Sequence, residues 1–308
     1  NGLNAQMGPG TWAFIDTDAR TAQVNALGTD AIKVGLLYKP SRVTPVGRTA
    51  VLNSVDFVNG GDNGPRNRPS LAQAFQRPDF SQVVVDVNHL KSKGSACNAP
   101  DLGDGQGNCA RVRTNAAILL HQWLASDPTE TGERDVLILG DLNAYARETP
   151  IAALTANGYT DMVAALGGAT AYSYAFDGQW GYLDHALAST SLMSQVTGVV
   201  EFHINADEPS VLDYLTAFKS PGQVSSLYAP DVFRSADHDP LLVGLNLAPP
   251  APFFLGPVRN LPSLNAENSG RAIPITFSLG GNKGLGVFAP GSPSSRPFDC
   301  TTGIASLT

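Results

Sequence analysis

The sequence lacks long hydrophobic runs, an excess of basic charge and a recognisable leader. No stretch of its 308 residues approaches the roughly 18 consecutive apolar residues that a membrane-spanning helix requires, so we predict no membrane span. The formal net charge is −7, which argues against nucleic-acid binding driven by overall charge. No signal peptide is visible, and since Asn1 is not a start residue, we expect a mature form or a fragment.

Basic side chains are nevertheless concentrated in one part of the chain. Residues 39–113 carry ten Lys and Arg against six Asp and Glu, whereas residues 148–247 carry two against eleven. Such a local excess can form a patch that faces phosphate groups, although a mixed solvated surface explains it equally well. Lys91, Lys93 and Arg111 belong to this basic part and are candidate phosphate contacts.

Only three cysteines occur, and two of them border one loop. Cys97 and Cys109 flank eleven residues rich in Gly and Asp, which a disulfide would restrain. Two spaced cysteines can also bind a metal, but no second pair of Cys or His accompanies them. We therefore predict a Cys97–Cys109 disulfide and an oxidising compartment, whereas Cys300 has no visible partner.

A strand followed by a polar pair is the most informative stretch of the sequence. Residues 136–139 are Val-Leu-Ile-Leu, which is typical of a buried strand that stops at Gly140. Asp141 and Asn143 follow, and residues two positions apart point to the same side of a strand. A carboxylate can hold a metal or accept a proton, and a carboxamide can donate to an anionic oxygen. Alone, the pair is a weak indication, because both residues also occupy ordinary turns.

Three other predicted strands also carry polar residues at their ends. One strand ends in His89, another begins at Asp184, and a third is preceded by His238. If the strands of His89 and Asp141 run antiparallel to the other two, all four residues lie on one rim of the sheet. Each residue alone could belong to an unrelated loop, but the set and its placement predict a site.

Four aromatic residues precede Asp184 in the sequence. In a protein that binds nucleic acid they could stack on bases, but aromatic residues around a strand are more typical of a core. We therefore expect them in the core. They are Tyr172, Tyr174, Phe176 and Trp180.

Four segments contain the polar residues, namely Asn88–Gly94, Gly140–Tyr145, Tyr182–His185 and Phe233–Pro240. Together they resemble the endonuclease/exonuclease/phosphatase superfamily of deoxyribonuclease I. Within it they are most similar to secreted bacterial extracellular nucleases of the ExeM/NucH kind, as is a further segment at residues 203–209. The resemblance covers about residues 1–247, the expected catalytic domain.

This resemblance implies an α/β (α+β) fold. We expect a four-layered αββα sandwich of two mainly antiparallel sheets, with helices outside and the site at one end of the sheets. The family pattern also includes an early Asn and a metal-binding Glu, and neither can be assigned in this sequence. We therefore expect that part of the N-terminal half-sheet precedes Asn1, which would leave His89 without its usual carboxylate partner.

The resemblance also implies metal-dependent phosphodiesterase chemistry. His238 would lie beside the scissile phosphate, and Asp184 would orient its ring. Asp141 would act on the attacking water or on the leaving group. Asp141 and Asp237 would bind Mg²⁺ or Mn²⁺, with Ca²⁺ as a further candidate. The other expected catalytic residues, which donate to phosphate oxygens, are His89 and Asn143, and the expected contacts to nucleic acid are Asn88, Lys91, Lys93 and Arg111.

The composition changes after residue 247. Residues 248–257 read as a Pro-rich linker, extended and stiff. Beyond it, Pro274–Leu279 together with Cys300 resembles the PxKF-type immunoglobulin-like modules appended to secreted bacterial proteins. Residues 258–308 are far fewer than the roughly 100 residues of a whole immunoglobulin sandwich, so we expect a partial β module.

Three functions remain open from the sequence. The first is a secreted or cell-surface bacterial endonuclease whose substrate is DNA, with RNA as a second candidate. The second is another phosphodiesterase or phosphatase of the same fold, such as a sphingomyelinase, although the sequence shows no evident hydrophobic hairpin for lipid insertion. The third is an inactive truncated domain with a binding or structural role.

Overall fold

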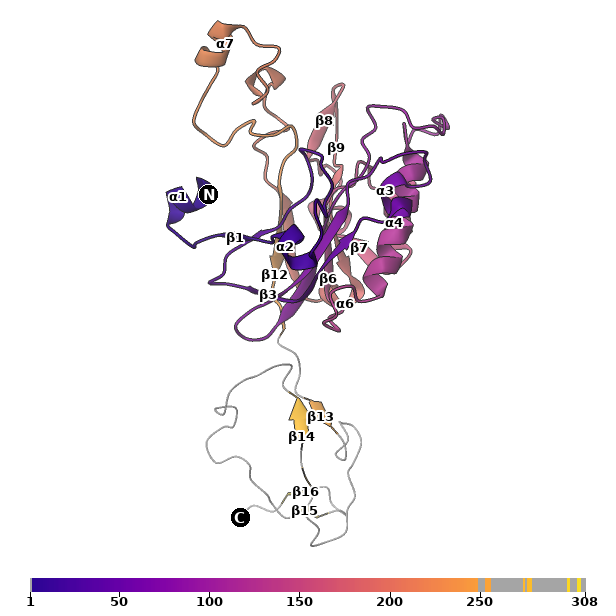
Figure 1. The fold of residues 1–308 in the computed structure, drawn as a ribbon, viewed down its shortest axis with the longest axis vertical. Helices are drawn as coiled ribbons and strands as arrows, with labels where there is room; N and C mark the ends of the chain where they lie inside the picture. The colour runs from indigo at the N-terminus through magenta and orange to yellow at the C-terminus, as the bar shows by residue number, and fades with distance from the viewer. Residues whose placement is uncertain are drawn as a thin grey trace. The chain divides into compact units, whose positions relative to one another are not determined.

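A computed structural model of the protein describes residues 2–248 and, beyond them, Pro274 and the backbone of four short strands. The chain divides into two compact units, Asn1–Ala248 and Pro249–Thr308 (Figure 1). The first unit contains every residue predicted to take part in the site, so the fold of that unit decides how the site is built.

The second unit is described only in its short strands. Phe253–Leu255 (β13) pairs antiparallel with Thr276–Ser278 (β14), and Phe298–Asp299 (β15) pairs antiparallel with Ile304–Ala305 (β16). The predicted linker, the predicted immunoglobulin-like module and Cys300 otherwise lie outside the described residues.

The first unit is built on a six-stranded sheet. In spatial order its strands are Thr44–Leu52 (β3), Ser70–Gln76 (β4), Gln82–His89 (β5), Val136–Asp141 (β6), Asp184–Ser189 (β10) and Tyr159–Asp161 (β7). β5 and β6 run parallel, and every other neighbouring pair in this sheet is antiparallel. A mainly antiparallel sheet, as predicted from the sequence, is thus confirmed.

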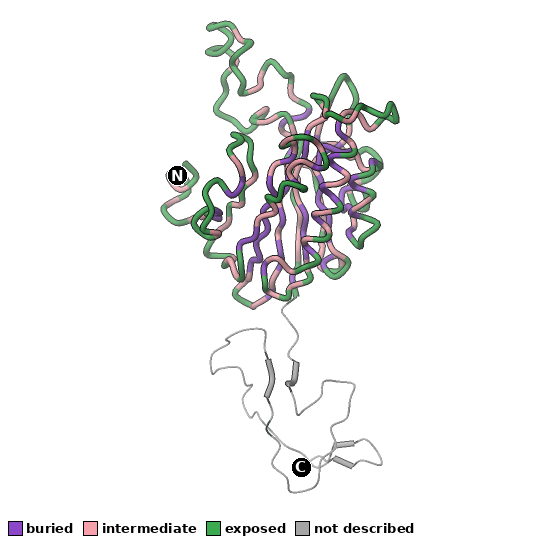
Figure 2. Tube along the Cα trace, turned by 45° about the vertical axis from the view of Figure 1, so that its right-hand side comes forward, coloured by how far each residue is buried: buried purple, intermediate pink, exposed green. Residues whose placement is uncertain are grey.

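Both faces of this sheet are covered, which explains the continuous apolar runs in its central strands. Val84 and Ile138 pack into one core cluster, whereas their neighbours Val83 and Leu137 pack into another. Successive side chains of a strand point to opposite faces, so the two clusters lie on opposite sides of the sheet. The strands accordingly form the most buried part of the trace in Figure 2.

Helices cover one face of the sheet: Val55–Asn59 (α3), Ala110–Ala125 (α4) and Thr149–Thr155 (α5). Phe57 of α3 and Leu120 of α4 are fully buried in the same cluster as the strand residues on that face. The helices stand beside the sheet in Figure 1. They form one outer layer of the sandwich.

The opposite face packs against a second pair of strands and the N-terminal segment. Val196–Glu201 (β11) pairs antiparallel with Leu241–Leu245 (β12), and Ile15 of the N-terminal segment is buried against the main sheet. The mixed α/β sandwich predicted from the sequence is therefore confirmed. Among the described residues its second sheet consists of β11 and β12, on which Val200 and Leu242 remain half exposed.

The remaining elements of the first unit are short. No helix among residues 2–248 is long and apolar enough to cross a membrane. The short elements are Gly2–Met7 (α1), Ala13–Phe14 (β1), Thr17–Thr21 (α2), Leu37–Tyr38 (β2), Val163–Gly167 (η1), Tyr174–Phe176 (β8), Gln179–Gly181 (β9), Thr190–Met193 (α6), Ser210–Leu212 (η2) and Pro221–Ser226 (α7).

A disulfide joins Cys97 and Cys109, whose Cα atoms lie 5.4 Å apart. This separation is ordinary for a bonded pair. The bond closes the loop of residues 98–108 directly before α4 begins. The loop that follows β5 is thereby tied to the helical layer.

Gly140 is a glycine that the sheet itself requires. Its φ is +126°, and a Cβ atom at this position would collide with the backbone carbonyl of Asn88 on the neighbouring strand. Gly140 and Asn88 are partners in the β5–β6 ladder, so neither backbone can move aside without loss of pairing. We expect Gly140→Ala to lower the free energy of unfolding by at least ~3 kcal/mol, measured by urea denaturation.

Gly132→Ala provides the matched control for this prediction. Gly132 also has a positive φ, +70°, but a Cβ atom there would meet nothing within 4 Å. Its substitution should cost only about 1 kcal/mol, from the strained backbone alone. Equal losses in the two variants would show that the approach of β5 does not determine the residue at position 140.

Candidate active site

Three adjacent strands bring three of the predicted residues together at one rim of the sheet. His89 pairs with Asp141 in the parallel ladder of β5 and β6, and Asp184 pairs with Asp141 in the antiparallel ladder of β6 and β10. Asp141 shares its strand face with Leu137, and Asp184 shares its face with Ala186. Leu137 and Ala186 belong to the core on the second-sheet side. Both carboxylates therefore point toward that side.

His238 reaches the same rim from the loop that precedes β12. Its Nδ1 lies 2.7 Å from Asp184 Oδ2, and the Ser173 hydroxyl donates to that oxygen at 2.6 Å. Burial disfavours the charged ring, but the hydrogen bond and negative charge of Asp184 outweigh burial and raise the pKa of His238 to about 9. The ring is therefore protonated at neutral pH, and its Nδ1–H donates to Asp184.

Asp141 is a carboxylate held against a like charge. Burial, followed by the negative charge of Asp184, raises the pKa of Asp141 to about 6. The backbone N–H of Asn143 donates to Asp141 Oδ1 at 2.7 Å, and its carboxamide donates to Oδ2 at 2.9 Å. A carboxylate with a perturbed pKa beside a second carboxylate is typical of a site that handles protons or cations.

The structure gives Asn143 a different role from the one expected from the resemblance. Its Nδ2 donates to the carbonyl of Leu90 at 3.1 Å and to Asp141 Oδ2, which uses both amide hydrogens. The side chain is buried, and the backbone φ of +49° turns the chain sharply after β6. Asn143 thus orients Asp141 and has no N–H left to donate to a phosphate in this arrangement.

His89 lies on the other side of Asp141 from His238. Its Nε2 is 3.4 Å from Asp141 Oδ2. Burial, and next the positive charge of Arg68, lowers the pKa of His89 from its usual value. His89 is therefore neutral at neutral pH, in contrast to His238.

Asp141, Asp184 and His238 form a cluster whose potential ligand atoms all lie within 4.8 Å of one another. Mg²⁺ and Mn²⁺ prefer carboxylate oxygen, so the two aspartates suit either cation. Asp141 and Asp184 place like charges side by side, and a cation between them would neutralise that charge. A protonated imidazole offers no lone pair, so His238 suits the cation less well. The residues present fit a divalent cation held by the two carboxylates.

Asp237, predicted as a metal ligand together with Asp141, lies outside this cluster. Its side chain is 57% exposed, and its Oδ2 is 3.9 Å from His238 Nε2. The structure therefore pairs Asp141 with Asp184 rather than with Asp237. The register of β6 with β10 places these two aspartates opposite each other, and this register cannot be read from the sequence.

Two of the predicted phosphate contacts point away from the rim. Asn88 is buried and its carboxamide donates to Asp86, because its position on β5 directs it toward the helices rather than with His89. The Lys91 ammonium is largely buried and donates to the carbonyl of Ser92 and the hydroxyl of Ser95. Neither side chain is brought to the cluster.

The other two predicted contacts differ in their surroundings. Lys93 Nζ forms an ion pair with Glu148 at 2.5 Å and donates to the carbonyl of Gln106. Arg111 is exposed in the first turn of α4. Lys93 therefore holds two loops together, and Arg111 is free to meet solvent.

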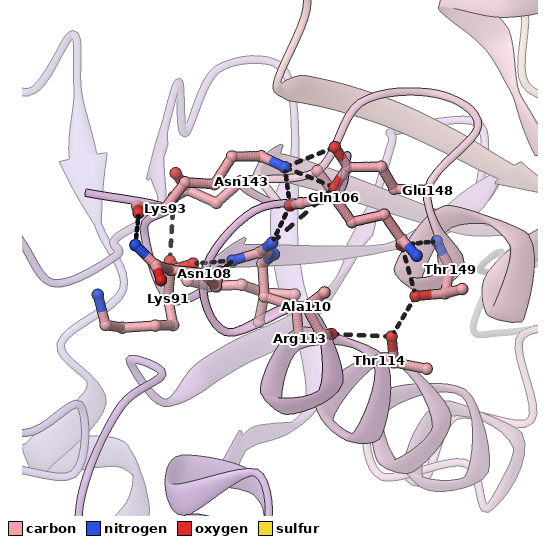
Figure 3. A network of polar contacts seen from close by, with 12 residues as sticks. Lys91, Lys93, Gln106, Asn108, Ala110, Arg113, Thr114, Asn143, Glu148 and Thr149 are labelled. Atoms are coloured by element: carbon pink, nitrogen blue, oxygen red, sulfur yellow. Dashed lines mark hydrogen bonds and ion pairs between the residues drawn. The ribbon is translucent and has the colours of Figure 1, made fainter. Parts of the chain in front are cut away.

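A buried polar network supports the loops that carry the site (Figure 3). Arg113 of α4 is fully buried and donates to the carbonyls of Lys91, Asn108 and Gln106. Its guanidinium also lies 3.9 Å from the carboxylate of Glu148. The disulfide-closed loop and the loop before α5 are thus anchored to the same helix.

Aromatic residues on the β8–β9 hairpin also border the site. The ring centroids of Tyr174 and His238 lie 4.4 Å apart, whereas Phe176 and Trp180 are 65% and 55% exposed. The expectation of a core position is therefore wrong for Phe176 and Trp180. The turn Asp177-Gly178 between the strands, which is typical of a hairpin, is the signal that could have placed them at the surface.

Residues 8–238, about three quarters of the chain, match the sequence pattern of the family described as "Endonuclease/Exonuclease/phosphatase family". No curated protein matches the sequence. A solved structure of the mannosyl-6-phosphatase Bt3783 from Bacteroides thetaiotaomicron VPI-5482 is 14% identical with a TM-score of 0.51, covering 79% of each chain. This likeness concerns the fold alone.

Two further structures show weaker likeness. An endonuclease/exonuclease/phosphatase family protein from Bacteroides thetaiotaomicron is 13% identical with a TM-score of 0.45, covering 62% of this chain and 65% of that one. The chain thus spans just under two thirds of that protein's length. The 3′-5′ exonuclease of Neisseria meningitidis is 14% identical with a TM-score of 0.42, and the match covers 80% of this chain and 92% of that one.

Proposed function

Because the chain belongs to the endonuclease/exonuclease/phosphatase family, and is on that ground a hydrolase of phosphoester bonds, we propose that it is a metal-dependent endonuclease. The observation that carries the proposal is the pairing of His238 with Asp184 directly beside Asp141. The proposed substrate is DNA, with RNA as a second candidate. We place the enzyme outside the cell, because the Cys97–Cys109 disulfide favours an oxidising compartment.

The proposed chemistry begins with binding of the scissile phosphate at His238. Phosphodiester cleavage requires stabilisation of charge on the phosphate oxygens and an attacking water in line with the leaving oxygen. His238 is cationic at neutral pH, and its Nε2 lies beyond hydrogen-bond distance from Asp237. Nε2–H can therefore donate to a phosphate oxygen, while Asp184 holds the ring in place.

Asp141 supplies the acceptor for the attacking water. Without a cation the pKa of this carboxyl is about 6, so the carboxylate is ionised near neutral pH and can accept a hydrogen bond from the water. Asn143 fixes its direction, and neutral His89 borders it on the other side. Asp141 and Asp184 would hold the divalent cation, which would supply positive charge beside the phosphate when bound.

A lipid phosphodiesterase of the sphingomyelinase kind is the second candidate function. The observation in its favour is the exposed aromatic hairpin with Phe176 and Trp180, which the sequence did not make evident. The turn of this hairpin contains Asp177, however, and a carboxylate there opposes insertion into hydrocarbon. We therefore rank nucleic acid above lipid.

The experiment that tests the proposal is a nicking assay on supercoiled plasmid. The protein is incubated with Mg²⁺, with Mn²⁺ or with chelator, and RNA and sphingomyelin vesicles are assayed in parallel. We expect nicking with either cation and loss of nicking, by at least ~10²-fold, in chelator. Cleavage of sphingomyelin alone would favour the second candidate, and no hydrolysis of any substrate would favour a binding or structural role.

A further inference from the structure

We propose that Tyr174 and Phe176 form a stacking platform for an unpaired nucleobase of the nucleotide next to the scissile phosphate. The preferred substrate would then be a single strand or an unpaired segment of a longer nucleic acid. This inference rests on the proposed endonuclease function and specifies the form of its substrate.

The two rings lead outward from the reacting centre. Tyr174 and Phe176 are two positions apart on β8, so their side chains share one face of the hairpin. Their ring centroids lie 6.4 Å apart with an interplanar angle of 16°, and Tyr174 in turn packs against His238. A nucleotide whose phosphate binds at His238 would therefore lie next to these rings.

The base of the hairpin is anchored to the catalytic pair. The Ser173 N–H donates to the carbonyl of Gly181 on β9, and the Ser173 hydroxyl donates to Asp184. The Ser173 carbonyl accepts a hydrogen bond from the backbone N–H of Asp239, next to His238. The rings are therefore held at a fixed place relative to Asp184 and His238.

A third aromatic ring and a cation lie beside the platform. The Tyr145 ring occupies the space over Gly181, where a Cβ atom would approach it within 2.8 Å. Gly181 is the partner of Tyr174 across the hairpin, so the absence of its side chain leaves room for Tyr145. Lys93 Nζ lies 5.2 Å from the centroid of the Tyr145 ring. Glu148 neutralises this ammonium, so the contribution of Tyr145 is a further aromatic face, the kind of surface on which bases of single-stranded nucleic acid stack.

The exposure of Phe176 favours a base as the occupant. A single exposed apolar residue is ordinary, but this one is 65% exposed and continues a ring stack that begins at the catalytic histidine. Every nucleobase has a flat face that can stack on such a ring, and a base inside a duplex has both faces covered. The turn residues Asp177 and Gly178 make membrane insertion of the same hairpin unfavourable.

The test compares variants of Phe176 on two strands of equal length. One is a single-stranded oligodeoxynucleotide, and the other is a strand of abasic deoxyribose phosphates, which keeps the phosphates and lacks the bases. We expect Phe176→Ala to lower kcat/KM roughly 5- to 150-fold on the first and to leave the second unchanged. Phe176→Leu should behave like the alanine variant, and Phe176→Trp should retain activity, because only the latter keeps an aromatic face.

Phe14→Ala is the matched control, since Phe14 is 63% exposed on β1, outside the hairpin, and its loss should change neither rate. Equal losses on both strands, or full activity of Phe176→Ala on the oligonucleotide, would overturn the platform while the endonuclease function stands. A wild-type protein that cleaves neither DNA nor RNA would overturn the function itself. If Phe176→Ala lost sphingomyelin hydrolysis but cleaved the oligonucleotide normally, the platform would bind a lipid surface and not a base.

Discussion

His238→Ala is expected to lower the rate of phosphodiester hydrolysis by at least ~10²-fold, the lower range for a positioned acid, base or phosphate-binding group. In the proposed chemistry the ring carries the positive charge that meets the phosphate, and it lies between Asp184 and Asp237. The fold should survive, because His238 lies on the loop before β12 and takes no part in the ladders of the main sheet. The rate is measured on plasmid at saturating Mg²⁺ or Mn²⁺, with circular dichroism to verify folding.

Two companion variants make this prediction specific. Asp184→Asn should impair the same step, and the double variant should lose less than the sum of the single losses, because the two residues act as a unit. His121→Ala, a histidine of α4 that packs against Tyr159, should leave the rate unchanged. Near-normal cleavage by His238→Ala would mean that the cluster is not the catalytic centre.

Asp141→Asn is expected to abolish most activity and to change how stability depends on pH. The pKa of Asp141 is about 6 in the folded protein, above the usual 3.8 of an aspartate. Between these two values the folded state binds more protons than the unfolded state, so this carboxyl lowers the stability of the wild type as the pH rises from 4 to 6. An asparagine does not titrate, so the stability of the variant should not show this decrease between pH 4 and pH 6.

The measurement is urea denaturation of both proteins at pH 4 and pH 8 in chelator. From pH 4 to pH 8, the free energy of unfolding of the variant should rise by on the order of 2–3 kcal/mol relative to that of the wild type. The altered hydrogen bonds to Asn143 add a loss of stability that is the same at both pH values and does not affect this difference. Mg²⁺ at pH 8 should stabilise the wild type more than the variant. Parallel pH profiles for the two proteins would contradict the raised pKa.

The rim of polar residues could be predicted because strand ends are visible in the sequence. The apolar run before Asp141 and the strand that ends in His89 show where each strand ends. Because the two strands are parallel neighbours, their ends lie side by side at the same rim. The partner of Asp141 could not be predicted in the same way. Its identity depends on the register of β6 with β10, which is set by contacts between residues more than forty positions apart.

Other features depended on the direction of side chains and on loop paths. Asn88 and His89 are adjacent in sequence, yet strand alternation sends one to the helices and the other to the rim. Lys91 turns inward because the carbonyl of Ser92 and the hydroxyl of Ser95, in the following loop, accept hydrogen bonds from its ammonium. The exposure of Phe176 likewise follows from its place in a short surface hairpin, which composition alone does not reveal.

The anchoring of the site across distant strands also bears on how the protein folds. The hydrogen bond between His238 and Asp184 joins residues 54 positions apart, and that between Asn143 and Leu90 joins residues 53 apart. Loops of this length close late, since their entropy must be lost before the contacts form. Recovery of activity after dilution from denaturant should therefore follow the slowest conformational phase, when the last strands dock on a sheet that is already formed.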